Sequence, residues 1–195
     1  LGTRRIRNLQ DNNMQSNMTY VIDRYTPFDI SKYPNNPKVV LIMMGLIDNS
    51  LYDVIEIKSL LSSIKNKYNG KYIFLADELP VGVNYATESI SYKQLNNQIE
   101  NYNKTLIKYA SELGIKSITL QSGMCTSNIL NSSYAYNGVD LNTVGCKMLL
   151  NNIKYQIKNN VNSYTPPNSD DSDSSDSSNN PYREKIIKKN RKIKS

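Results

Sequence analysis

The chain has 195 residues, a formal net charge of +7, 38% hydrophobic residues, two cysteines and no histidine. This length allows one domain with a full hydrophobic core. Most of the excess positive charge lies in residues 183–195, so the rest is too mildly basic to indicate a nucleic-acid-binding protein. No apolar run reaches the roughly 18 residues of a transmembrane helix, and a histidine-dependent active site is excluded within this sequence.

The first half of the chain contains two apolar runs that predict strands and two helical patterns. In chain order we predict a short strand over 4–9, a helical face over 14–25, a buried strand over 38–44 and a helix over 50–68. The run KVVLIMM at 38–44 is apolar on both faces, which is typical of a parallel sheet. Ser50 and Asp53 form a weak capping box at the start of the second helix.

The second half continues the alternation of strands and helices. We predict a strand over 72–76, a polar loop to about 91, a long helix ending at Gly114, a strand over 115–120, a loop over 122–142 and a helix over 143–160. In the last helix the predicted buried residues are Val144, Met148, Leu149, Ile153 and Ile157. Such alternation predicts an α/β fold in which helices cover both faces of a parallel sheet. Ligands of these folds bind beyond the carboxyl ends of the strands, here at 45–49, 77–85 and 121–142.

The composition divides the chain into a domain and a tail. Residues 1–162 carry the apolar patterns, and we expect one α/β domain there. Residues 163–195 form a Ser/Asp-rich linker and a basic tail, which we expect to be disordered because they have few apolar residues to bury. The basic tail could contact an anionic surface. Cys125 and Cys146 lack metal-binding spacing and could form a disulfide or remain thiols, so no metal or cofactor is predicted.

Three stretches resemble the SGNH (GDSL-type) hydrolases. Residues 39–51 (VVLIMMGLIDNSL) resemble the strand and turn that hold the family's G-x-N-D block. Residues 72–115 resemble its strand ending in proline and the helix with a central asparagine, here Asn103. Residues 136–153 (YNGVDLNTVGCKMLLNNI) resemble its D-G-x-H-L-N-x-x-G block. The resemblance implies a three-layer, flavodoxin-like parallel sheet and the hydrolysis of esters, with a small ester or an acylated glycan as ligand.

The departures from the family concern its catalytic residues. The nucleophile motif GDS is missing, and the resemblance begins only at the family's second strand, so we expect a domain that lacks the first strand. Ile47 replaces the asparagine of the oxyanion hole, although Gly45 and Asp48 remain, and such a loss costs about 3–4 kcal/mol of transition-state stabilisation. Asn137 and Asp140 stand where the family has its catalytic aspartate and histidine.

These replacements lead to two main hypotheses and two weaker ones. A carboxylate with a pKa of about 4 is a poor general base unless burial raises that pKa. The first hypothesis is therefore an esterase domain that is impaired or inactive, and the second is a non-catalytic binding or scaffold module. An esterase using other carboxylates (Asp48, Asp77, Glu78 or Asp140) is less favoured, because we interpret these as solvated strand-end acids. A nucleotide-binding protein would need a phosphate loop, which the sequence lacks.

The missing first strand predicts one more feature. In SGNH hydrolases the first strand lies between the second and the third, which correspond here to residues 4–9 and 38–44. We therefore expect either a gap between these two segments or their direct pairing.

Overall fold

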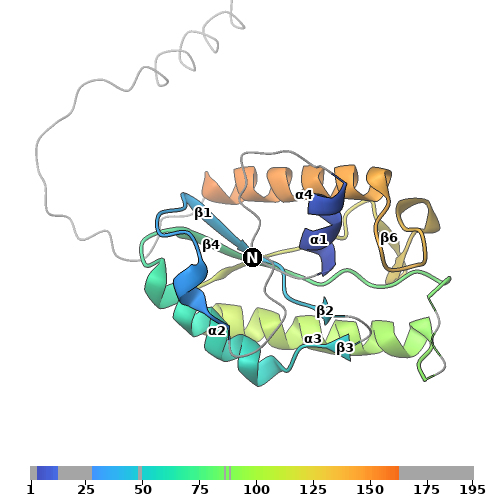
Figure 1. Cartoon of the computed structure of the whole chain (residues 1–195), viewed down its shortest axis with the longest axis horizontal. Helices are drawn as coiled ribbons and strands as arrows, with labels where there is room; N and C mark the ends of the chain where they lie inside the picture. Colours follow the sequence, from blue (N-terminus) through green and yellow to red (C-terminus); the bar gives the residue numbers. More distant parts are fainter. Residues whose placement is uncertain (1–3, 13–27, 48–49, 86, 88, 163–195) are drawn as a thin grey trace, which may run out of the picture.

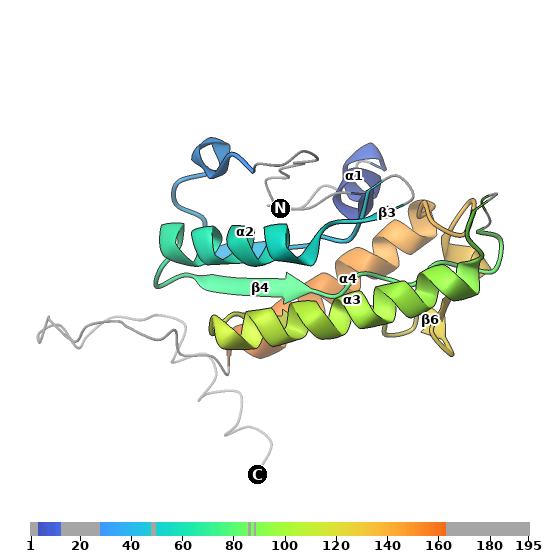
Figure 2. The same ribbon diagram turned by 90° about the horizontal axis from the view of Figure 1, so that it is seen from below.

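The computed structural model describes residues 4–12, 28–47, 50–85, 87 and 89–162. They form three layers (Figure 1). The middle layer is a sheet of β1 (Val39–Ile42), β4 (Tyr72–Ala76) and β5 (Lys116–Ile118). Helices α2 (Val54–Lys67) and α3 (Tyr92–Glu112) cover one face, whereas α1 (Arg4–Asp11) and α4 (Thr143–Val161) lie on the other. Figure 2 shows α2 and α3 side by side along β4.

The sheet is parallel, as predicted, and β4 is its central strand. Val39 of β1 lies opposite Tyr72, and Phe74 of β4 lies opposite Lys116 of β5. A hydrophobic core lies on each face of the sheet, and successive residues of β4 point into opposite cores. Ile73 and Leu75 pack with α2 and α3, whereas Phe74 packs with α1 and α4. Burial on both faces explains why β4 has no polar alternation. The predicted α/β fold class is thus confirmed.

Side-chain caps fix where the helices begin. Asp53 accepts hydrogen bonds from the amides of the first turn of α2 and is therefore its N-cap. Ser50 does not take that role, because Ser50–Leu51 (β3) pairs antiparallel with Leu46–Ile47 (β2). The N-cap of α3 is Ser91, in a capping box, and that of α4 is Asn142.

The long connection between β5 and α4 has structure of its own. It contains a hairpin of β6 (Cys125–Thr126) and β7 (Ile129–Leu130), followed by the short 3-10 helix η2 (Ser132–Tyr134). Ser127 and Asn128 form the turn with positive φ angles of 50° and 59°. A second 3-10 helix, η1 (Ile30–Lys32), lies before β1.

Residues 4–9 are not the strand that we predicted. They belong to α1, so their pairing with residues 38–44 was also wrong. The buried residues of α1 are Arg5, Ile6, Asn8 and Leu9. Two of these four are polar, and an apolar periodicity therefore could not reveal the helix.

Two further predictions also need correction. Val144 is not buried but 59% exposed, and Met148 and Ile157 are only half-buried. Leu149 and Ile153 are buried as predicted, together with Cys146 and Leu150. Cys125 and Cys146 are free thiols, which rules out the disulfide alternative in this fold. The helical face predicted over 14–25 and the tail predicted over 163–195 lie outside the described residues. None of the described helices has both the length and the apolar character of a membrane-crossing segment.

Candidate functional site

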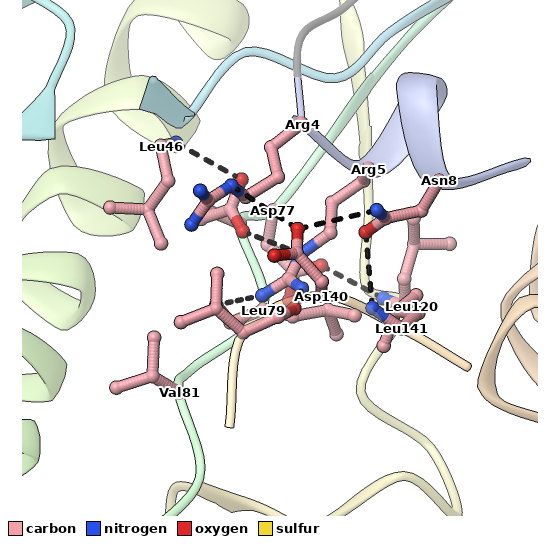
Figure 3. A network of polar contacts seen from close by, with 12 residues as sticks. Arg4, Arg5, Asn8, Leu46, Asp77, Leu79, Val81, Leu120, Asp140 and Leu141 are labelled. Carbon is pink, nitrogen blue, oxygen red and sulfur yellow. Dashed lines mark hydrogen bonds and ion pairs between the residues drawn. The ribbon is translucent and has the colours of Figure 1, made fainter. Parts of the chain in front are cut away.

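The loops after the strands meet helix α1 around a buried ion pair (Figure 3). Arg5 of α1 is 2% exposed and Glu78, two residues beyond β4, is 4% exposed. The Nε atom of Arg5 donates to Oε1 of Glu78 over 2.9 Å. Because a buried charge without a partner costs several kcal/mol, each of these side chains depends on the other.

The guanidinium of Arg5 also joins two loops that are far apart in sequence. Its two terminal nitrogens donate to the backbone oxygens of Val139 and Leu79, the latter over 3.3 Å. One side chain therefore holds α1 against the loop after β4 and against the loop before α4. The planar guanidinium group of arginine has N–H donors on all three nitrogens, so it can bind three acceptors at once.

Two buried asparagines of α3 fix the backbone of the loop after β4. Asn103 accepts from the amide of Glu78 and donates to its carbonyl oxygen, both over 2.8 Å. Three residues further along, Asn96 accepts from the amide of Val81 over 2.7 Å and donates to its carbonyl oxygen over 2.9 Å. These two side-chain amides satisfy backbone groups of Glu78 and Val81 and so fix the backbone from which the Glu78 side chain projects.

The carboxylate of Glu78 reaches from this loop to the turn after β1. Its Oε2 atom accepts a hydrogen bond from the amide of Leu46 over 3.4 Å. A Cβ atom at position 45 would overlap the same carboxylate, so the close approach requires Gly45. Glycine at this position of the G-x-N-D-like block therefore has a direct physical reason here.

Asp140 lies close to this ion pair and is also held by neighbours. Its carboxylate accepts from Asn137 Nδ2 over 3.0 Å and from Asn8 Nδ2 over 3.4 Å, and it lies 3.4 Å from Arg4 Nε. Partial burial opposes the charged form, but the hydrogen bond from Asn137 and the charge of Arg4 outweigh it. The pKa of Asp140 is therefore lowered from its ordinary value of 3.8.

Asp77 joins the ends of β4 and β5. It accepts from the Thr119 hydroxyl over 2.7 Å and from the Leu120 amide over 2.8 Å. Burial raises the pKa of Asp77 from 3.8, and these hydrogen bonds offset only part of that effect. We interpret Asp77 as a connector of two strand ends.

The structure brings together several of the residues that the sequence singled out. Gly45, Asn137 and Asp140 all border the network around Arg5 and Glu78. Asp48 and the side chain of Ile47 lie outside the described part of the chain. Within that part, no three His, Cys, Asp or Glu side chains converge as a metal site would require.

Sequence reasoning missed the centre of the network. Glu78 was interpreted as a solvated acid, but it is buried and paired. Arg5 and Asn8 carried no signal, since a buried arginine has no periodicity of its own. The one available hint was the unusual position of Glu78 directly before the apolar residues Leu79 and Val81.

No protein-family model matches the sequence, and no curated protein matches it. Solved structures do show similarity. A protein from Lactobacillus plantarum matches with 10% identity and a TM-score of 0.55, over 70% of this chain and 75% of that one. A candidate acylhydrolase from Bacteroides fragilis matches with 22% identity and a TM-score of 0.49, over 63% of this chain. A GDSL-like lipase from Bacteroides thetaiotaomicron matches with 18% identity and a TM-score of 0.46, over 64% of this chain.

These likenesses concern the fold. This chain spans 62% of the length of the acylhydrolase and 62% of the length of the lipase. The parallel sheet and the match at a TM-score of 0.55 support the three-layer α/β fold that the sequence predicts.

Proposed function

We propose that this chain is an SGNH hydrolase-type domain whose ester hydrolysis is impaired or absent. The observation that carries the proposal is the environment of Asp140, at the position where the resemblance places a catalytic histidine. Asp140 is ion-paired with Arg4 and accepts hydrogen bonds from Asn8 and Asn137, and its pKa is lowered.

A general base in acyl transfer takes a proton from a hydroxyl group and returns it to the leaving group. This exchange is efficient when the pKa of the base lies near the working pH. The partners of Asp140 move its pKa in the opposite direction. At neutral pH the carboxylate therefore has little affinity for the proton that it would have to accept.

The turn after β1 also argues against stabilisation of an oxyanion. The amide of Leu46, in the G-x-N-D-like block, already donates to Oε2 of Glu78. An oxyanion at this amide would compete with a carboxylate, whereas catalysis needs donors directed at the place where negative charge develops. Arg5 compensates the charge of Glu78 but is itself engaged with three acceptors.

A colorimetric ester tests this proposal. The full chain, Asp140→Ala and the exposed-site control Glu56→Ala would be incubated with p-nitrophenyl acetate, after circular dichroism has shown that all three are folded. We expect release of p-nitrophenol at the uncatalysed rate for each. Turnover by the wild type and by Glu56→Ala that disappears in Asp140→Ala would overturn the proposal.

The second candidate is a non-catalytic binding or scaffold module. Its support is the cross-linking of the strand-end loops by Arg5, Asn96 and Asn103, which ties these loops to helices α1 and α3. A small ester or an acylated glycan is the ligand class that the fold suggests. Titration with an O-acetylated sugar, followed by amide chemical shifts, would show binding as saturable shifts around residues 136–141, and no shift at millimolar sugar would refute it.

A further inference from the structure

We propose that Glu78 and the backbone oxygens of Leu79 and Val139 form a guanidinium-binding site, which Arg5 of helix α1 occupies as an internal ligand. This inference goes beyond the proposed function and does not depend on whether esters are hydrolysed. It assigns a ligand class, the alkylguanidinium, to the loops beyond the strand ends.

The contacts of Arg5 are those of a bound ligand. Its Nε atom and both terminal nitrogens each find an acceptor, and one of the three acceptors is a buried carboxylate. The side chain is 2% exposed, so water does not compete for these donors. A carboxylate combined with two carbonyl oxygens around a planar group matches guanidinium more closely than it matches the compact ammonium of lysine.

The acceptors are held by contacts other than those of the Arg5 side chain. Asn103 fixes the backbone of Glu78 from α3, and the leucine at position 79 is the next residue along the same segment. The amide of Val139 donates to the Asn137 side chain over 3.0 Å, which fixes the other loop. These contacts do not involve the Arg5 side chain, so removal of that side chain alone leaves them in place.

Helix α1, in contrast, depends on its contacts with the rest of the domain. It has eight residues, fewer than an isolated helix needs in water. It is held by the apolar contacts of Ile6 and Leu9 with the α4 core and by the polar contacts of Arg4, Arg5 and Asn8. Arg5 supplies only part of this attachment, so a free guanidinium can take the place of its side chain while Ile6, Leu9 and Asn8 keep α1 docked.

The test removes the internal ligand and supplies a free one. In the full chain, Arg5→Ala empties the site, and methylguanidinium chloride is added up to 20 mM at constant ionic strength while the Tm is measured. For a dissociation constant of about 1 mM we expect a saturable rise in Tm of about 4–7 °C. Methylammonium at the same concentration tests whether charge alone suffices. Arg7→Ala, a half-buried arginine of the same helix outside the network, is the matched control.

The expected pattern is specific to one variant and one ligand. Wild type and Arg7→Ala should not be stabilised, because Arg5 fills the site, and Arg5→Ala/Glu78→Gln should not respond, because its carboxylate is gone. An equal response of wild type and Arg5→Ala, or an equal effect of methylammonium, would overturn the proposal. If Arg5→Ala does not fold alone, recovery of folding by methylguanidinium supports the site, and failure to recover refutes it.

Discussion

Replacing Asn103 by alanine removes the side chain that holds the backbone of Glu78. Two hydrogen bonds of 2.8 Å are lost, and the amide and the carbonyl of a 4% exposed residue are left without these partners. A buried polar group without a partner costs about 1–3 kcal/mol, so two cost about 2–6 kcal/mol. Alanine has a higher helix propensity than asparagine, which offsets about 0.5 kcal/mol of this loss. The free energy of unfolding of Asn103→Ala should thus fall by about 1.5–5.5 kcal/mol.

Urea unfolding followed by circular dichroism measures this change, and Asn101→Ala is its matched control. Asn101 lies on the exposed face of the same helix, so the same substitution should there change the free energy of unfolding by less than about 0.5 kcal/mol. A loss below about 1 kcal/mol for Asn103→Ala would refute the reasoning. In that case water or a rearranged loop would satisfy the backbone of Glu78.

The remaining predictions concern protonation. The folded-state pKa of Asp140 is lowered, so its contribution to stability is present above pH 3.8 and is lost as the pH falls through the folded-state pKa. Urea unfolding between pH 6 and pH 3 should therefore show Asp140→Asn approaching wild type at low pH, and a constant difference would contradict this. The pKa of Asp77 is raised, so stability falls as the pH rises from 3.8 through its folded-state pKa, and Asp77→Asn should lack this decline in the same titration. Burial raises the pKa of Cys125 to about 12 and that of Cys146 to about 11, from 9.0. At pH 8 both thiols should react with iodoacetamide at least about 100-fold more slowly than in urea, and dithiothreitol should leave the Tm unchanged.

The sheet and the three long helices could be predicted because they are built from apolar periodicity. Continuous apolar runs predict strands that are buried on both faces, and such runs occur at 38–44 and 72–76. The structure has β1 and β4 at these two places. The end of α3 at Glu112, two residues before Gly114, follows from local backbone preferences. These are local signals, and local signals are what a single sequence carries best.

The candidate site was harder to predict because long-range polar contacts create it. Arg5 meets residues that are 73 to 134 positions away, and nothing near Arg5 in sequence indicates them. The resemblance singled out Gly45, Asn137 and Asp140, which border the network, but their functional role stays a prediction. It could not indicate Glu78 or Arg5, whose burial depends on each other and on the complete fold.

The distant contacts of α1 also bear on how the domain folds. The hydrogen bond between Asn8 and the amide of Leu141 joins residues 133 positions apart, whereas β1 and β4 pair at a separation of only 33. If this long loop closed early, most of the chain would lose conformational entropy before other contacts had formed to offset that loss. Docking of α1 therefore belongs to the late part of the folding route. Weakening its attachment should accelerate unfolding and leave the rate of folding nearly constant.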